Sequence, residues 1–166
     1  RRLFIALRTR WHVQPLQTGL IALSFSGNYG LLWLGLAFAF WIGGVYNGRA
    51  MIVMMPIVVF STLAINYAIK SILGRERPVL DEPGLEPLVG VPSSKSFPSS
   101  HAAMSFAAAT VFVYFRPSLW PVFYSLAFLV SWSRVYVGVH YPSDVLAGMF
   151  IGLASGCFWA IFLYWV

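Results

Sequence analysis

Long apolar runs, separated by short polar segments, dominate the pattern of hydrophobic and polar residues along this chain. A helix that crosses the hydrocarbon core of a bilayer needs about 20 apolar residues, within a range of about 17–25. The runs show no sustained alternation with a period of two, so strands are not expected. The pattern predicts five membrane-spanning helices, at residues 31–46, 50–69, 102–114, 117–132 and 145–166, the shorter ones extending into their flanks.

Two segments depart from this pattern. Residues 1–29 mix basic and apolar side chains, which predicts an interfacial amphipathic segment interrupted by Pro15. Its apolar stretch at residues 16–25 is too short to span, and the sequence SGNYG at 26–30 indicates a turn. Residues 74–98 hold five prolines and four of the five acidic residues, so we expect an extramembrane loop there.

The composition supports an integral membrane protein. Hydrophobic residues make up 59% of the chain and charged residues 10%, whereas a soluble domain is about half apolar and a quarter charged. We therefore predict an all-α fold, a polytopic transmembrane helical bundle that forms one domain over residues 1–166. The net charge of +6 is scattered among the spans and forms no basic groove, so nucleic acid is not an expected partner. Membrane lipids and a phosphate substrate suit this charge better.

Counting spans places three separated polar segments at one face of the membrane. The second and third predicted spans flank the loop at 74–98, so Lys70 and His101 lie on the same face. The fourth span returns to that face with Arg134, and the fifth leaves from it after His140 and Asp144. The topology alone therefore predicts that these residues are neighbours.

Three cations in these segments are suited to bind a phosphate. Arg77 and Arg134 each offer a planar fork that matches two phosphate oxygens, and Lys70 supplies a point charge. The same charges would stabilise the more highly charged transition state of phosphoryl transfer. Arg75 and Lys95 lie nearby but outside this spacing, and we interpret them as anchors at the ends of spans.

The sequence PSSH at 98–101 precedes an apolar helix. Ser99 or Ser100 would cap that helix, whose free N–H groups form a site for an anion. His101 follows in the first turn. Because the pKa of histidine lies near neutrality, His101 can protonate a leaving alkoxide.

His140 and Asp144 are four residues apart, and Pro142 between them suits the first turn of a helix. This offset allows the carboxylate to reach the imidazole, to fix its tautomer and to make the other ring nitrogen a better nucleophile. A two-metal phosphatase is the rival interpretation. It needs several carboxylates and histidines, but the acidic residues of the loop show no ligand spacing.

These residues resemble the three-part signature of the type 2 phosphatidic acid phosphatase superfamily. The patterns K-x6-R-P at 70–78, P-S-x-H at 98–101 and S-R-x5-H-x3-D at 133–144 follow the family's order and spacing. The one difference is Ser100, where the family has glycine. The family's membrane members usually have six spans, so the resemblance suggests that a first span is absent or trimmed here.

The resemblance implies a role for each residue. His140 would form a phosphohistidine supported by Asp144, and His101 would protonate the leaving group and then activate water. The phosphate would be bound by Lys70, Arg77, Ser99, Ser100 and Arg134. No metal or other cofactor is implied, and vanadate is expected to inhibit.

The expected substrate is a lipid phosphate in a bacterial plasma membrane. A polyprenyl phosphate or diphosphate, a polyprenyl-linked sugar phosphate, phosphatidic acid and phosphatidylglycerol phosphate all remain open. The small size and Ser100 are similar to actinobacterial-type members acting on polyprenyl-phosphoryl ribose phosphate. Basic residues favour a cytoplasmic site, whereas many bacterial relatives face outward. An anion transporter and a catalytically inactive lipid-binding relative are the alternative functions; the oligomeric state is not indicated.

Overall fold

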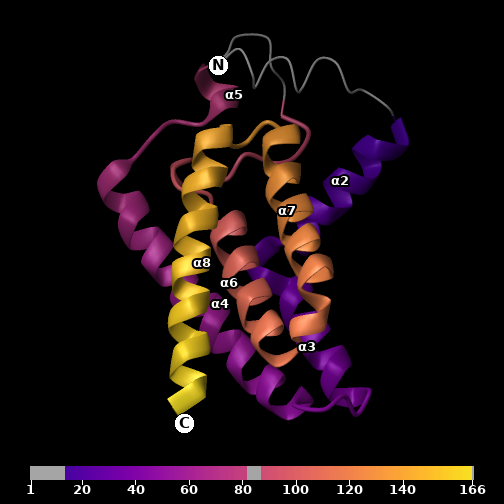
Figure 1. Cartoon of the computed structure of the whole chain (residues 1–166). Coiled ribbons are helices and arrows are strands. Elements are labelled where there is room, and N and C mark those ends of the chain that lie inside the picture. Colours follow the sequence, from indigo (N-terminus) through magenta and orange to yellow (C-terminus); the bar gives the residue numbers. More distant parts are fainter. Residues whose placement is uncertain (1–13, 82–86, 166) are drawn as a thin grey trace.

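The computed structural model describes residues 14–81 and 87–165 of the chain (Figure 1). Within these residues, helices joined by short connections make up the fold, in agreement with the predicted all-α class. In chain order they are α2 (Gln14–Ser26), the 3₁₀ turn η1 (Asn28–Gly30), α3 (Leu31–Ile42), α4 (Gly48–Leu73), α5 (Pro78–Asp81), α6 (Ser100–Phe115), the 3₁₀ turn η2 (Pro117–Leu119), α7 (Trp120–Tyr136) and α8 (Pro142–Trp165).

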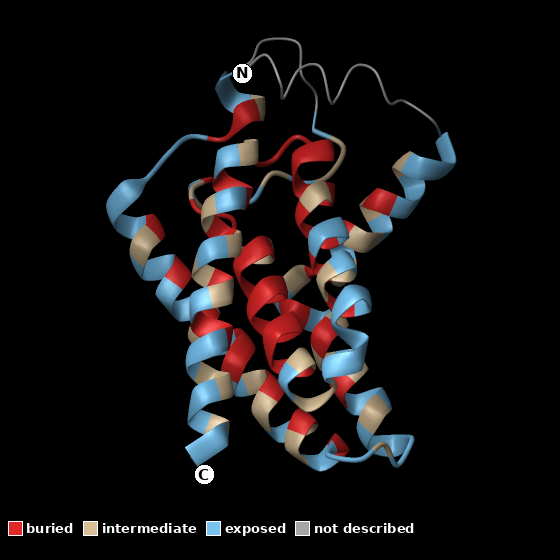
Figure 2. Ribbon diagram, viewed as in Figure 1, coloured by how far each residue is buried: buried red, intermediate tan, exposed pale blue. Residues whose placement is uncertain are grey.

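The central element of the bundle is α6, which the neighbouring helices surround (Figure 1). All eleven consecutive residues from Ala102 to Phe112 are buried, as the continuous red segment of Figure 2 shows. A helix that is apolar on all sides has to be buried on all sides. Its alanines at 102, 103 and 107–109 keep it narrow, so that α4, α7 and α8 can pack closely around it.

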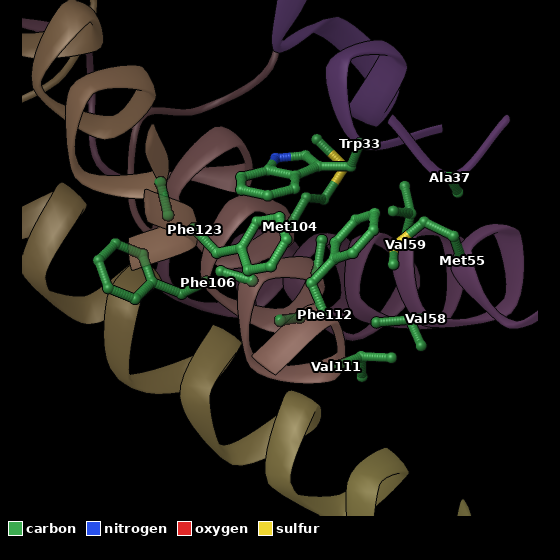
Figure 3. Packing of buried hydrophobic residues seen from close by; sticks show 14 of the residues in the cluster. Trp33, Ala37, Met55, Val58, Val59, Met104, Phe106, Val111, Phe112 and Phe123 are labelled. Atoms are coloured by element: carbon green, nitrogen blue, oxygen red, sulfur yellow. The ribbon is translucent and has the colours of Figure 1, made fainter. Parts of the chain in front are cut away.

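Aromatic residues fill the core on the side of α3. Trp33 and Phe112 are fully buried, and their ring centroids are 5.9 Å apart (Figure 3). Phe112 also stacks on Phe123 of α7, with 4.8 Å between the centroids. The indole Nε1 of Trp33 donates a hydrogen bond of 3.1 Å to the hydroxyl of Ser105. This bond satisfies a polar group that would be costly to bury alone.

Glycines at every fourth position of α8 let it approach α6. A Cβ atom at Gly152 would collide with the Ala103 carbonyl oxygen, and one at Gly156 would lie 2.6 Å from the Cβ of Thr110. Small residues at such positions allow two membrane helices to pack backbone to backbone. The same contact brings the start of α8 to the start of α6, where the Ser99 N–H donates a 2.9 Å hydrogen bond to the Asp144 carbonyl.

The predicted apolar runs coincide with α3, α4, α6, α7 and α8. Among the described residues, the stretches Gly48–Asp81 and Pro142–Trp165 are long and apolar enough to cross a membrane. The bent pair of α2 and α3 would make a third span. The apolar helix α6 is shorter, so the prediction of five spans stays a prediction.

The N-terminal segment differs in detail from its expected form. Residues 1–13 lie outside the described residues, so the basic part of the predicted interfacial segment is not described. The stretch after it forms α2, which packs against α7. The turn predicted at 26–30 is confirmed: α2 and α3 meet there at an angle of 64°. Tyr29 and Gly30 have positive φ angles of 51° and 74°.

Candidate active site

The three polar segments meet at one end of the bundle, the upper end in Figure 1. They enclose a cavity of about 290 Å³. None of the described residues that line it is acidic. The predicted residues in its wall are Lys70, Arg77, Ser100, His101, Arg134 and His140. Both histidines therefore face one space that also holds three cations.

Arg77 joins the loops around the cavity. Its Nε donates to the carbonyl oxygens of Pro92 and Ser94, at 3.1 and 2.9 Å. Its Nη1 donates to the Val139 carbonyl at 2.9 Å and lies 3.4 Å from Nε2 of His140. The guanidinium is thus held in place before any ligand binds, with one nitrogen directed at the predicted nucleophile.

Lys70 and Arg134 come from the last turns of α4 and α7, and both are buried. The Lys70 ammonium lies 5.7 Å from the centre of the Tyr67 ring. Nη1 of Arg134 donates a hydrogen bond to the hydroxyl of Ser24, while its Nε is buried without a hydrogen-bond partner among the described residues. A buried N–H of this kind is costly unless a ligand accepts from it.

The first turn of α6 carries Ser99, Ser100 and His101. Ser99 occupies the N-cap position, but its side chain makes no capping hydrogen bond, and its buried hydroxyl has no partner among the described residues. The prediction that the Ser100 side chain caps the helix is also wrong, because its hydroxyl donates a 2.7 Å hydrogen bond to Oδ1 of Asn66 in α4. The first N–H groups of α6 therefore remain available for an anion.

His140 lies in the connection between α7 and α8, and its imidazole is buried. Its Nδ1 is 3.6 Å from Oδ2 of Asp144, slightly longer than a hydrogen bond. The four-residue spacing thus places the two groups together, as predicted. Burial lowers the pKa of His140 to about 3, against the opposing effect of Asp144 and with the help of the positive charge on Arg134. Its ring is neutral at ordinary pH, as a nucleophile must be.

Arg75, which the sequence suggested as a span anchor, also contacts the site. Its Nη1 donates to Oδ1 of Asp144 at 2.7 Å and to the Ser143 hydroxyl at 2.8 Å. Asp144 is fully buried; Arg75 compensates the charge on its Oδ1 side, while Oδ2 accepts a 2.9 Å hydrogen bond from the Tyr141 N–H. Lys95, by contrast, forms an exposed ion pair with Glu76. The sequence held one indication of the contact with Asp144: Arg75 is an additional cation two residues before Arg77, in a chain with few charged residues.

The turn between α2 and α3 also reaches the site, which the sequence did not indicate. We call residues 24–30 the elbow. Ser24 accepts the hydrogen bond from Arg134, and Oδ1 of Asn28 lies 3.0 Å from Nε2 of His101. Both elbow residues line the cavity. The N-terminal segment thus completes a wall of the site that the three motifs leave open.

The chain is thus a helical bundle with a cavity at one end that is lined by cations and histidines. Residues 50–166 match the PAP2 superfamily, and the chain belongs to this family. The matched region contains every predicted site residue. The elbow precedes it.

Similar proteins include YbjG of Escherichia coli, which is 31% identical over 124 residues, covering 74% of this chain and 61% of that protein. The decaprenylphosphoryl-5-phosphoribose phosphatase of Mycobacterium tuberculosis is 39% identical over 97 residues, covering 58% of this chain and 52% of that protein. The chain thus spans between half and two thirds of the length of these two relatives.

Two solved structures have a similar fold. LpxE of Aquifex aeolicus aligns with a TM-score of 0.81 at 23% identity, covering 96% of this chain and 93% of that one. A transmembrane PAP2 type phosphatidylglycerolphosphate phosphatase from Bacillus subtilis aligns with a TM-score of 0.65 at 25% identity, covering 99% of this chain and 94% of that one. The arrangement of helices is therefore that of known PAP2 phosphatases.

Proposed function

We propose that this chain is a lipid phosphatase that transfers the phosphate of its substrate to His140 and then to water. The observation that carries the proposal is the single cavity lined by His101, His140 and three cations, with no acidic residue in its described wall. A phosphate dianion fits this charge, and it would accept from the buried Nε of Arg134, which has no hydrogen-bond partner within residues 14–81 and 87–165.

In the first step, Nε2 of His140 attacks phosphorus. A P–N bond forms, the bond from phosphorus to the lipid oxygen breaks, and His101 gives a proton to that oxygen. Nδ1 of His140 faces Asp144, which orients the ring and stabilises its developing positive charge. Arg77, 3.4 Å from Nε2, is placed to contact the phosphoryl group as it arrives.

In the second step, water attacks phosphorus and gives a proton to His101 as the P–N bond breaks. Inorganic phosphate leaves and Nε2 of His140 regains its lone pair. Lys70, Arg77 and Arg134 supply the positive charge that metal ions supply in a two-metal phosphatase. We therefore propose that the reaction needs no metal.

The proposed substrate is a polyprenyl-linked phosphate in the membrane. The cavity wall includes apolar side chains that continue from the cations, among them Phe25, Leu63 and Met104. If the phosphate group binds beside the cations, the lipid chain of the substrate would lie next to these apolar side chains. The polyprenyl class is supported by the similarity to the mycobacterial decaprenylphosphoryl-5-phosphoribose phosphatase.

A transporter is less well supported, because polar side chains within the bundle bond to each other. Thr62 and Ser155 share a 2.6 Å hydrogen bond, and Trp159 donates to Ser61 at 3.0 Å. Such pairs join helices, so these polar groups are satisfied within the bundle. A catalytically inactive relative would lack a catalytic histidine or its carboxylate, and His101, His140 and Asp144 are all present.

The test is release of inorganic phosphate by the purified full chain in detergent. The substrates are decaprenyl phosphate, undecaprenyl diphosphate, phosphatidic acid and phosphatidylglycerol phosphate, each assayed with a metal chelator. Turnover is expected, and His140→Ala should abolish it while Lys95→Met retains it. Turnover by the His140→Ala variant would refute the assigned nucleophile, and a requirement for added magnesium would refute the metal-free reaction.

A further inference from the structure

The elbow is built against the imidazole of His101. A Cβ atom at Gly27 would lie 2.8 Å from Cδ2 of His101 and 2.8 Å from Cγ1 of Val130. Real Cβ atoms essentially never approach so closely, so a larger residue at position 27 would force the side chain of His101 or Val130 to shift. The left-handed conformations of Tyr29 and Gly30 then turn the chain away into α3. The fold thus places the next residue, Asn28, directly beside the ring.

Oδ1 of Asn28 lies 3.0 Å from Nε2 of His101, within hydrogen-bond distance. A carboxamide oxygen only accepts, so in this pairing Nε2 carries a proton. An acceptor on one nitrogen of a catalytic histidine fixes its tautomer and ring orientation, and leaves the other nitrogen to exchange a proton.

We propose that Asn28 is a positioning residue for His101: it holds the Nε2–H so that Nδ1 gives a proton to the leaving oxygen and takes one back from water. The inference rests on the proposed phosphatase function and deepens it by adding a residue outside the region that matches the family. Asn28 acts through His101 and forms no bond with phosphorus.

Asn28 is uncharged, and this matters because positively charged groups surround His101. The charged and titratable groups that act on its imidazole include Arg134 from α7, His140 from the α7–α8 connection and Lys70 from α4. A carboxylate at position 28 could also accept from Nε2, but it would attract the same cations that bind the phosphate. A carboxamide supplies the acceptor without that competition.

Leaving-group dependence separates this role from a purely structural one. The alkoxide of benzyl phosphate is strongly basic and needs a proton as it leaves, whereas p-nitrophenolate needs almost none. General acid catalysis contributes on the order of 10²–10⁴-fold. The His101→Ala variant should therefore lose far more kcat/KM on benzyl phosphate than on p-nitrophenyl phosphate.

Asn28→Leu, which keeps the size and removes the acceptor, should show the same pattern at smaller amplitude. We expect a loss on the order of tenfold in kcat/KM on benzyl phosphate and almost none on p-nitrophenyl phosphate. Asn28→Asp keeps an acceptor, so it should retain kcat on benzyl phosphate but raise KM. Ser26→Ala is the matched control, because the hydroxyl of Ser26 donates to a local acceptor, the Leu23 carbonyl, at 2.8 Å. Its activity should not change.

Equal losses on both substrates in Asn28→Leu, or no loss, would overturn the inference while the phosphatase function stands. If His101→Ala shows no preference between leaving groups, the acid role of His101 fails and the inference fails with it. If the unmodified chain hydrolyses neither these esters nor any lipid phosphate, the proposed function itself fails. Should Asn28→Leu not fold, Asn28→Ala must show the same selective loss.

Discussion

Arg75 illustrates how one side chain can matter without lining the cavity. It forms an ion pair with the fully buried Asp144, which in turn faces His140. Removing Arg75 would take the cation away from a buried carboxylate that keeps the Tyr141 N–H and the His140 ring beside it, and a buried carboxylate that loses its ion-pair partner is destabilised. The carboxylate would then move or become protonated, and the imidazole of His140 would lose its support.

We therefore expect Arg75→Met to lower kcat on the order of tenfold with little change in KM, measured by phosphate release over a range of substrate concentrations. Lys95→Met is the matched control, because the ion pair of Lys95 with Glu76 is exposed and contributes about 0–1 kcal/mol. A higher KM with unchanged kcat in Arg75→Met would contradict a role through Asp144 and indicate direct contact with substrate.

The pKa of His140 predicts how acid affects the stability of the fold. Burial lowers this pKa to about 3, whereas an unfolded histidine titrates near about 6.5. Protons therefore bind more tightly to the unfolded chain. The contribution of a neutral His140 is fully present above about pH 6.5 and is lost progressively as the pH falls toward the folded value.

At about pH 5 this difference corresponds to about 2 kcal/mol. The Tm of the unmodified protein in detergent should thus fall between about pH 7.5 and about pH 5 by several degrees more than that of His140→Asn, which has no proton to gain. Thermal unfolding followed by circular dichroism measures both. Parallel declines in the two proteins would show that His140 does not titrate on unfolding.

At the scale of single residues, the sequence predicted the features that depend on short spacings along the chain. His140 and Asp144 are only four residues apart across the start of α8, and His101 lies in the first turn of α6. The partners of Arg75 and Asn28 lie 69 and 73 positions away. Contacts of this range are set by tertiary packing, and nothing in the local pattern distinguishes Arg75 from an anchor or Asn28 from a turn residue.

At the scale of elements, the close packing of α6 against α8 holds the starts of these two helices together at the site. Gly152 faces the Ala103 carbonyl so closely that a methyl group would force the helices apart. The carbonyl of Asp144 at the start of α8 accepts from Ser99 at the start of α6. Separation of the helices would therefore also break this hydrogen bond between the starts of α6 and α8.

We expect Gly152→Ala to lower stability by about 1–3 kcal/mol, the usual cost of overpacking, and to reduce phosphatase activity as well. Gly35→Ala is the control: Gly35 lies in α3, and a Cβ atom there meets nothing within 4 Å. That substitution should be neutral or slightly stabilising, because alanine is the better helix former. Thermal unfolding in detergent compares the two, and equal Tm values would show that the α6–α8 contact tolerates a methyl group.

At the scale of the whole molecule, hydropathy and span counting were enough to predict that the polar segments converge. The helices α4, α6, α7 and α8 alternate in direction, so their site-bearing ends must share one face (Figure 1). What the pattern missed is the bend of 64° between α2 and α3. A helix of 13 residues is too short to span alone, and only its packing against α7 places it beside the site.

The opposite ends of the bundle provide a test of this topology. Ser93 lies in the proline-rich loop at the site end, and Ser118 lies in η2 at the other end; both are exposed. Cys157 is the only cysteine of the chain, so replacing it by alanine gives a background in which Ser93→Cys and Ser118→Cys can be labelled singly. A membrane-impermeant maleimide should label one in intact cells and the other in inverted vesicles.

Labelling of both positions from the same side would contradict the alternation of helices on which the convergence of the site depends. Labelling from opposite sides would also decide the orientation of the site, for which the positive residues favour the cytoplasm. A charged headgroup does not cross the hydrocarbon core readily. The side on which position 93 reacts therefore identifies the leaflet from which a lipid phosphate reaches His140.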